Sequence, residues 1–431
     1  MSPAAGALCF VASVIVQGRG IHGPADLCGG RSLTGRRTRS SGAGTHRPVT
    51  LPAQGRRKKL SSLEMDASKV PAAPTSVWVA CGEESAHRCL AGRPLSSPQG
   101  FLMANPPGPY TCLRTVEHRS AAMLQFHLDR LWESAEATGL GPAARAEGRL
   151  PLERRTTEII ARVMESFWEE NRDVESGCPE CMVTVTYACG GSPGDTVNQP
   201  AVEEGLQDRR PLHVLAHAWP LPTTPQKGRD SGVRVLVAGS GRSQPLAKHS
   251  SWLRDRRPLD ELKAQAGAQE VVLFETECSP EGASRRILLE GLTSNFFVVE
   301  EDGAVCTAPS GVLLGGVRQL VISVCEQEGI ALRLEAPDVT RASRWREAFL
   351  TGTGRILCPI TTLVVPENGQ ANDTTKPFSS ATSRIELPVL KTDEGVLGGT
   401  ATSGEDGTPS VGHALRRLLD AGLAQTATRL F

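Results

Sequence analysis

An apolar stretch in the second half of this chain carries one acidic residue among its hydrophobic neighbours. It reads Glu290-Gly-Leu-Thr-Ser-Asn-Phe-Phe-Val-Val299 and is preceded by Leu289. The pattern predicts a pair of strands, or a bend around Glu290, over Ile287–Val299. A buried carboxylate is costly unless it has a partner, and Lys248 lies forty-two residues upstream in Ala247-Lys-His-Ser-Ser251. The chain must therefore fold so that this acid finds a partner.

Length and charge narrow the class of protein. A chain of 431 residues exceeds what one hydrophobic core usually supports, so we expect two domains. The formal net charge is zero, yet residues 1–63 carry ten Lys and Arg against the single acid Asp26. The rest of the chain is therefore mildly acidic, which argues against nucleic acid as the main partner. No stretch approaches the roughly twenty apolar residues of a membrane span, so no membrane association is expected.

The first 70 residues have the composition of a targeting segment. They are rich in Arg, Ser and Gly, and their one apolar run, Ala7–Val16, is too short to cross a membrane. We expect a transit peptide for a plastid or a mitochondrion. The alternatives are a disordered tail on a cytoplasmic protein and a true start at Met65. The basic run Arg56–Lys59 is less consistent with nuclear targeting, because it lies in the same acid-poor segment.

Hydrophobic periodicity and turn residues predict a mixed α/β (α+β) protein. Strands are expected at Ser76–Cys81, Gly100–Ala104, Pro109–Val116, Cys181–Ala188, Leu212–Ala218, Val233–Ala238, Glu270–Phe274, Ala331–Leu334, Glu347–Leu350 and Ile356–Val364. Helices are expected at Leu124–Thr138, Pro151–Arg172, Ser251–Gln265, Val317–Glu328 and His413–Ala424.

Composition also indicates the domain boundaries. The Pro-rich, charged segment 219–232 is predicted to connect a small N-terminal α/β domain, 76–218, to a larger C-terminal domain, 233–431. Residues 367–408 are rich in Gly, Thr, Ser and charge, which predicts an exposed insertion. The twelve cysteines are scattered. Cys178-Pro-Glu-Cys181 has the spacing of a metal or redox motif, but without a second such pair a turn bearing two thiols is favoured over zinc, and no metal is expected.

Lys248 and Glu290 have the chemistry of a covalent cofactor site. Lys248 follows an apolar strand and a Gly/Ser turn, where a lysine can project into a cleft and, once its pKa is lowered by burial, form an imine. A protonated pyridine nitrogen is a plausible partner for Glu290. The structural alternatives are a solvated surface lysine and an acid that is paired or faces water. Asn295 could serve either the backbone or a cofactor ring.

Three further features could bind a phosphate. Gly315-Gly316-Val317-Arg318 opens a predicted helix, where free N–H groups and the helix dipole attract anions. Thr351-Gly-Thr353-Gly354 offers hydroxyls and N–H groups in a turn. Arg130, in His127-Leu-Asp-Arg-Leu131, could hold phosphate oxygens through two donors. Each feature also occurs without a ligand, as a Gly-rich turn or as a solvated arginine on a helix.

The order of these motifs resembles the fold-type IV pyridoxal-phosphate enzymes, a family that includes branched-chain and D-amino-acid aminotransferases and aminodeoxychorismate lyase. The resemblance covers about residues 76–364 and the last helix. It rests on Tyr110-Thr-Cys-Leu-Arg114, His127-Leu-Asp-Arg-Leu131, Ala247-Lys248, Glu290-Gly-Leu-Thr-Ser-Asn295-Phe, Thr307-Ala-Pro309, Val312-Leu-Leu-Gly-Gly-Val-Arg318 and Phe349-Leu-Thr-Gly-Thr353.

The resemblance implies two α/β domains with pyridoxal 5′-phosphate in the cleft between them, a homodimer, and a small-molecule amino acid or aminochorismate substrate. Lys248 would carry the internal aldimine and shuttle the proton. Glu290 would hold the pyridine nitrogen, with Asn295 close by. By the same resemblance, the phosphate would be held by Arg130, Thr353 and the N–H groups of Gly316 and Val317. The substrate would meet Tyr110, Arg114 and Gly354.

The chain also departs from the family pattern. Gly315-Gly-Val-Arg318 stands where many members have Gly-Ile-Thr-Arg, so a phosphate-contacting hydroxyl is lost. Tyr110-Thr111 is closer to the lyase branch, where a threonine assists proton delivery, while Lys-His-Ser-x-Trp-x-Arg looks like a plant and algal D-amino-acid-aminotransferase-like branch. Three functions follow: an aminotransferase, a lyase that releases pyruvate from aminodeoxychorismate with Thr111 as a catalytic residue, and a cofactor-binding homologue without turnover.

Overall fold

The computed structural model describes the chain in several segments separated by gaps. The described residues are 78–81, 97–173, 178–189, 211–221, 232–278, 284–366, 382–387 and 410–431. The predicted targeting segment 1–70, most of the connector 219–232 and most of the insertion 367–408 lie outside them. Targeting to a plastid or a mitochondrion therefore stays a prediction.

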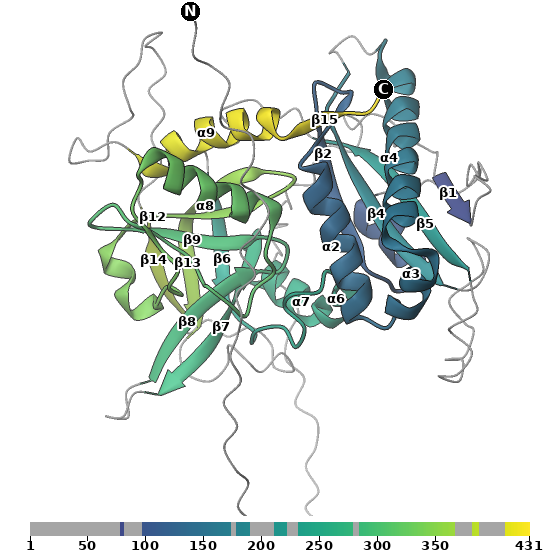
Figure 1. Ribbon diagram of the computed structural model, residues 1–431. Helices are drawn as coiled ribbons and strands as arrows, with labels where there is room; N and C mark the ends of the chain where they lie inside the picture. Colours follow the sequence, from purple (N-terminus) through teal and green to yellow (C-terminus); the bar gives the residue numbers. More distant parts are fainter. Residues whose placement is uncertain are drawn as a thin grey trace, which may run out of the picture. The chain divides into compact units, whose positions relative to one another are not determined.

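The first sheet is antiparallel throughout its described pairings. Its strand order is β1-β5-β4-β2-β3-β15. The strands are β1 (Trp78–Cys81), β2 (Tyr110–Val116), β3 (Ser120–Ala122), β4 (Cys181–Cys189), β5 (Leu212–Pro220) and β15 (Ala427–Arg429). Three helices accompany this sheet: α2 (Leu124–Ala137), α3 (Gly141–Glu147) and α4 (Arg149–Asn171) (Figure 1).

Helices α2 and α4 pack on this sheet through apolar faces with helical spacing. In α2 the buried positions include Leu124, Leu128 and Leu131, three or four residues apart. Ile160 of α4 and Val183 of β4 belong to the same core. Strand residues alternate between the two faces of a sheet, so the residues between these apolar positions lie on the opposite face. That face is more polar, and residues at the start of β2 contribute to it.

The second sheet contains nine strands, in the order β11-β10-β9-β12-β13-β6-β7-β8, with β14 beside β13. They are β6 (Val233–Val237), β7 (Glu270–Cys278), β8 (Ser284–Gly291), β9 (Asn295–Glu300), β10 (Val305–Cys306), β11 (Leu332–Arg333), β12 (Trp345–Gly352), β13 (Ile356–Pro366) and β14 (Thr382–Glu386). A 3-10 helix, η3 (Val339–Arg344), leads into β12.

Strand β8 pairs with β9 as well as with β7, through the single residue pair Glu290 and Asn295. This pair closes β6, β7, β8, β9, β12 and β13 into a ring of strands. Apolar side chains from these strands form one core, which includes Val235, Phe274, Leu288, Phe296, Val298, Leu350 and Ile360. The acid identified in the sequence therefore lies at the point where the ring closes.

Helices α8 (Gly316–Glu328) and α9 (Val411–Gln425) pack against each other and against β12 and β13 (Figure 1). After α9 the chain crosses to the first sheet, where β15 pairs with β3. Leu430 N then donates to the Arg119 carbonyl oxygen at 3.0 Å. The predicted C-terminal domain, 233–431, thus contributes its last strand to the other sheet, and the sequence contains no local signal for this long-range pairing.

Two predicted elements are wrong. Gly100–Ala104 is not a strand but part of helix α1 (Pro98–Met103), because Ser97 Oγ caps the helix by accepting from Gly100 N at 3.0 Å and Pro98 suits its first turn. The single helix predicted at Ser251–Gln265 is two helices, α6 (Trp252–Asp255) and α7 (Arg257–Gln265). Pro258 lies at the start of α7, where its missing N–H is harmless; inside one continuous helix it would break a bond.

The insertion 367–408 is not wholly exposed. Its described part forms β14, which pairs with β13, and Leu387 is buried in the core of the strand ring. Cys178 and Cys181 are both free thiols, the second of them buried. Among the described residues, no group of three or more His, Cys, Asp or Glu side chains could hold a metal ion. Nor does any described helix combine the length and apolar character needed to cross a bilayer.

Candidate active site

The loop that carries Lys248 is hydrogen-bonded to the beginning of β2. Tyr110 N donates to the Lys248 carbonyl oxygen at 2.9 Å, and Ser250 N donates to the Gly108 carbonyl oxygen at 3.0 Å. Gly108 N donates in turn to Ser250 Oγ at 3.0 Å. A side chain at Gly108 would collide with the Tyr187 carbonyl oxygen, 1.9 Å from an added Cβ. The close packing of Gly108 against β4 therefore requires glycine, and the three hydrogen bonds join the lysine loop to the first sheet.

The amine of Lys248 lies between the two sheets. Its Nζ atom is 4.7 Å from the centre of the Tyr110 ring. Burial first, then the charges of Arg130 and Lys248, hold the pKa of His127 well below its ordinary value. Lys248 also acts on Glu290, where its charge opposes the effect of burial on the pKa. The predicted amine is thus within electrostatic reach of the predicted acid on one side and of α2 on the other.

Glu290 is buried and held at both carboxylate oxygens. Arg242 Nε donates to Oε1 at 2.8 Å, and Leu313 N donates to Oε2 at 2.9 Å. Only 3% of the residue is exposed. Burial raises its pKa, against the opposing effects of Arg242, the Leu313 N–H and Lys248. The sequence indicated that this acid needs a partner but did not identify Arg242.

Asn295 secures the segment that leads into α8. Its Nδ2 atom donates to the Leu313 carbonyl oxygen at 2.8 Å. A Cβ at Gly315 would lie 2.2 Å from Asn295 Oδ1, so only glycine fits there. The amide therefore serves the backbone, the first of the two roles that the sequence left open. Its predicted contact with a cofactor ring stays a prediction.

The N-terminus of α8 borders a small cavity. Gly315 is its N-cap and has no side chain with which to cap the first N–H groups. The cavity is lined by Arg114, Met123, His127, Gly316, Val317 and Thr353, together with Ala122 and Leu423. The structure thus brings the predicted helix N-terminus and the predicted threonine together with an arginine and a histidine. Free N–H groups beside these side chains can bind an anion.

Arg130 is a buried cation without a carboxylate partner among the described residues. It is 7% exposed, and its NH2 group donates to Thr111 Oγ1 at 2.6 Å and is 3.0 Å from His127 Nδ1. Its Nε atom is buried and has no hydrogen-bond partner in the described structure. Burial lowers the pKa of this guanidinium to about 10, so it stays charged at neutral pH. A guanidinium with an unused N–H donor and no carboxylate partner can bind an anion.

The contacts of Arg130 fix the direction of the hydrogen bond between Thr111 and His127, whose Oγ1 and Nδ1 atoms are 2.7 Å apart. Arginine only donates, so both of these atoms accept from Arg130. The hydroxyl proton of Thr111 must then point to Nδ1, and the neutral imidazole carries its proton on Nε2. The hydroxyl of Thr111 therefore donates to His127 and accepts from Arg130.

The turn after β12 differs from its predicted role in one respect. Thr353 Oγ1 donates to the Cys112 carbonyl oxygen at 3.1 Å, and Arg114 NH1 donates to the Thr353 carbonyl oxygen at 3.4 Å. The buried hydroxyl without a partner in the described structure belongs instead to Thr351. A Cβ at Gly354 would meet nothing within 4 Å, so space is open there for a ligand. The repeated threonine in Thr351-Gly-Thr353 was the only sequence signal for this alternative.

These residues fit pyridoxal 5′-phosphate. The cofactor needs an amine for its aldehyde, an acid for its ring nitrogen and donors for its phosphate. Lys248 and Glu290 supply the first two. The Nε of Arg130, which has no partner in the described structure, and the uncapped start of α8 supply donors for an anion. A Cβ added at Gly316 would lie 3.1 Å from the ring of Phe126, so the start of α8 packs closely against α2.

Comparison with known proteins identifies the family. Residues 108–363, more than half of the chain, match the model of "Amino-transferase class IV". The "Putative branched-chain-amino-acid aminotransferase" of Methanocaldococcus jannaschii is 25% identical over 247 residues, which cover 55% of this chain and 72% of that protein. The chain belongs to the class IV aminotransferase family and is an enzyme of that family, so the resemblance in its motifs is confirmed.

Solved structures confirm the predicted two-domain fold. The T.th. branched-chain amino acid aminotransferase with pyridoxamine 5′-phosphate has a TM-score of 0.53 and 17% identity, over 83% of this chain and 99% of that chain. A hypothetical aminotransferase from Mycobacterium tuberculosis in a PLP-bound form has a TM-score of 0.50 and 18% identity, over 81% and 99%. At these identities the similarity establishes the fold, and the individual site residues stay predictions.

Proposed function

We propose that this protein is a pyridoxal-phosphate-dependent aminotransferase in which Lys248 bonds to the aldehyde of the cofactor. The observation that carries the proposal is the buried guanidinium of Arg130, which has no carboxylate partner in the described structure and contacts His127, one of the residues that line the cavity at the start of α8. A buried cation without a partner destabilises the protein, and binding of an anion offsets this cost. The phosphate is such an anion.

The residues of the chain divide the work. Arg130 and the first N–H groups of α8 bind the phosphate, and Glu290 accepts a hydrogen bond from the protonated ring nitrogen. The cofactor supplies an electron sink for the charge that develops when an amino acid loses its α-proton. Lys248 Nζ would take this proton from Cα and, in transamination, would deliver it to the cofactor carbon instead of back to Cα. The ring of Tyr110 supports the amine and helps to exclude water from it.

The substrate is proposed to be an amino acid that enters near Gly354 and Arg114, and the protein is proposed to be a homodimer, as the family resemblance implies. Because two relatives bear the name of branched-chain aminotransferases, branched-chain amino acids are the first donors to test. D-amino acids come next, since the run after Lys248 resembles that branch.

Borohydride reduction tests the covalent link. The purified protein, loaded with pyridoxal phosphate, is reduced and digested, and the modified peptide is mapped by mass spectrometry. We expect the label on Lys248. Amino acids with 2-oxoglutarate should then convert the visible absorption to that of the amine form. A label on another lysine, or no label, contradicts the proposal.

The hydrogen bond between Thr111 and His127 favours a second candidate, a lyase that releases pyruvate from aminodeoxychorismate. A threonine beside a neutral histidine can exchange a proton with it, as the lyase branch requires at this position. Pyruvate formation should then be lost in Thr111→Val while the cofactor stays bound. If Lys248→Ala keeps every measurable activity and interaction, only the homologue without turnover remains.

A further inference from the structure

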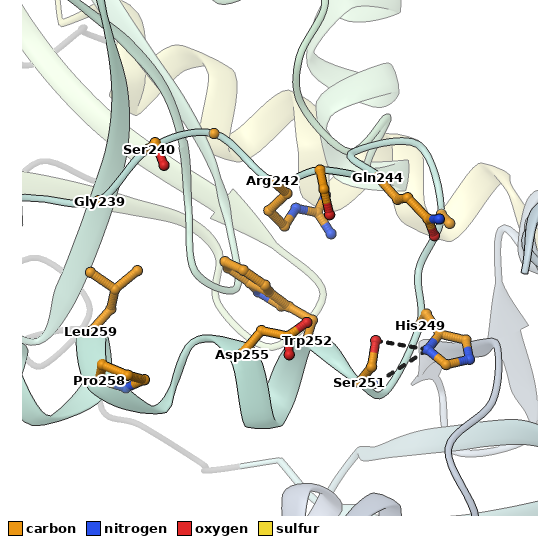
Figure 2. Close-up of a pocket in the computed structure, with 13 residues that line it drawn as sticks. Gly239, Ser240, Arg242, Gln244, His249, Ser251, Trp252, Asp255, Pro258 and Leu259 are labelled. Carbon is orange, nitrogen blue, oxygen red and sulfur yellow. Dashed lines mark hydrogen bonds between the residues drawn. The ribbon is translucent and has the colours of Figure 1, made fainter. Parts of the chain in front are cut away.

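Arg242 lies on the loop between β6 and α6, six residues before Lys248. Figure 2 shows its side chain beside Trp252 on the wall of a pocket that is also lined by Gln244, His249 and Asp255. Ala247 and His249 line this pocket, whereas Lys248, which meets Tyr110, is not among its lining residues.

Each end of the Arg242 guanidinium has a partner. Its Nε atom donates to Glu290 Oε1 at 2.8 Å, and its NH2 group donates to the Pro245 carbonyl oxygen at 2.7 Å. The guanidinium carbon is 5.5 Å from the Trp252 ring, and Trp252 Nε1 donates to the Leu292 carbonyl oxygen at 2.9 Å. These contacts give the arginine one orientation, which is fixed by both the loop and the segment after β8.

Glu290 is fixed by the same set of contacts. Arg242 binds one of its oxygens and the Leu313 N–H binds the other, so the plane of the carboxylate is set by two segments of the chain. An ionised carboxylate can accept about four hydrogen bonds, and each oxygen keeps a lone pair for another donor. The pair therefore leaves Glu290 able to accept from a ring nitrogen.

Other charged groups face Glu290, but none touches it among the described residues. Lys248 acts on it from the loop after β6, and Arg318 of α8 acts on it while donating its own NH2 group to the Ala308 carbonyl oxygen at 2.9 Å. Glu270 of β7 lies beside Gly291, the residue after Glu290, and accepts a hydrogen bond from Thr293 Oγ1. Burial favours the protonated form of Glu290, and Arg242 is the largest influence in the opposite direction.

We propose that Arg242 is a positioning residue that keeps Glu290 ionised and in one orientation, ready to accept from the protonated ring nitrogen of pyridoxal phosphate. The part that concerns the cofactor rests on the proposed function. Without Arg242, the buried acid would take up a proton and would then present an O–H donor, which cannot accept from a protonated nitrogen on that oxygen.

The pair itself is tested in the protein without cofactor, by a double-mutant cycle of Arg242→Met, Glu290→Gln and the double variant in denaturant unfolding. Each single change leaves a buried group without its partner, so the double variant should lose less than the two single losses combined. We expect a coupling of about tenfold or more in the unfolding equilibrium constant. Additive effects would overturn the proposal.

The role towards the cofactor is tested by titrating Arg242→Met with pyridoxal phosphate between about pH 6 and pH 8. We expect the affinity for pyridoxal phosphate to fall at least about tenfold, which is the equivalent of one pKa unit. We also expect the visible absorption of the bound cofactor to become pH-dependent in this range. Arg242→Lys should restore part of the affinity. Arg256→Met is the matched control, because Arg256 is also buried and donates to the Leu292 carbonyl oxygen but does not touch Glu290.

The outcomes separate the two proposals. If the wild-type protein binds no pyridoxal phosphate at Lys248, the proposed function fails, while the cycle without cofactor still decides whether Arg242 and Glu290 are coupled. If they are coupled but Arg242→Met has the same affinity and pH profile as Arg256→Met, Arg242 is merely structural and this inference is wrong.

Discussion

Glu290 and Arg130 are both buried charged groups at the candidate site, yet they are satisfied in opposite ways. Glu290 has an arginine on one oxygen and a backbone N–H on the other. Arg130 has a hydroxyl, an imidazole and the face of the Phe126 ring, whose centre is 5.1 Å from the guanidinium carbon, and its Nε has no partner in the described structure. The charge of Glu290 is therefore paired with an opposite charge before any ligand binds, whereas the charge of Arg130 has no carboxylate partner in the described structure.

This difference identifies where binding energy would come from. A buried cation that lacks a counter-ion destabilises the empty protein, and an incoming anion removes that cost. A buried acid that is already paired contributes orientation and charge. We infer that phosphate binding at Arg130 provides affinity, while Glu290 with Arg242 tunes the ring.

The largest expected effect comes from Lys248, whose amine lies between these two charges. Lys248→Ala removes the group that bonds to the aldehyde and moves the proton, so the rate with amino donors should fall about 10³-fold or more. Initial rates and borohydride labelling measure this. Lys263→Ala is the control, because Lys263 is a surface residue of α7 paired with Asp260. An equal loss in both variants would argue against a special role for Lys248.

Arg130→Met tests the incomplete cation directly. Loss of its charge-assisted bonds to phosphate should cost about 2 kcal/mol of binding, roughly thirtyfold in the Kd for pyridoxal phosphate. The protein without cofactor should be as stable as the wild type or more stable, because an unpaired buried charge has been removed. Titration calorimetry and denaturant unfolding measure the two quantities.

Arg155→Met is the matched control for this change. Arg155 is also largely buried, but it pairs with Glu147 at 2.8 Å and binds no part of the candidate site. Its loss should reduce the stability of the empty protein by about 2 kcal/mol, because Glu147 is left without its partner. A similar loss of stability in Arg130→Met would show that Arg130 is a structural residue, and the comparison with Glu290 would fail.

The sequence predicted those features that depend on local pattern. Helical spacing located α2 and α4, and short apolar runs located β2 and β4, within a residue or two of their bounds. The strand pair predicted over Ile287–Val299 is β8 and β9, for which the sequence predicted no separate bounds. Lys248, Glu290 and the start of α8 were recognised because each is a short motif with its own chemistry. The structure places all three motifs around one region, as the resemblance implied.

Features that depend on distant contacts were missed. Arg242, after β6, meets Glu290 of β8 because both strands pair with β7, and nothing near Arg242 in sequence indicates this. The pairing of β15 with β3 joins the ends of the described fold in the same way. The helix α1 begins for a local reason, because Ser97 caps it and Pro98 suits its first turn, whereas the short apolar run Gly100–Ala104 alone predicts a strand.

Thr111→Val sharpens the comparison by removing the hydroxyl that Arg130 binds. Val keeps the shape of Thr, so the cofactor should stay bound and transamination should fall about tenfold, the effect of losing one hydrogen bond to a charged group. Pyruvate release, if the protein is a lyase, should be abolished. Rates of both reactions measured on the same preparation decide between the two candidate functions, and Thr157→Val, on the far helix α4, provides the control.

The smallest effect at neutral pH is expected at His217, a buried group that lacks partners as Arg130 does but carries no charge. Both of its ring nitrogens are buried without a partner in the described structure, and its ring stacks on Phe101 at 5.2 Å. Burial lowers its pKa to about 4, from an ordinary 6.5. The unfolded chain therefore binds a proton below about pH 6.5, while the folded chain does so only near pH 4. Stability should be lost as the pH falls through this window, by about 3 kcal/mol in total.

His217→Phe keeps the stacked ring and removes this proton linkage. The variant should match the wild type near pH 7 and should be more stable at pH 4 to 5, as measured by denaturant unfolding at each pH. If His217→Phe instead weakens the binding of pyridoxal phosphate or substrate at neutral pH, the ring nitrogens of His217 bind a ligand. The absence of a charge is then not the property that distinguishes His217 from Arg130.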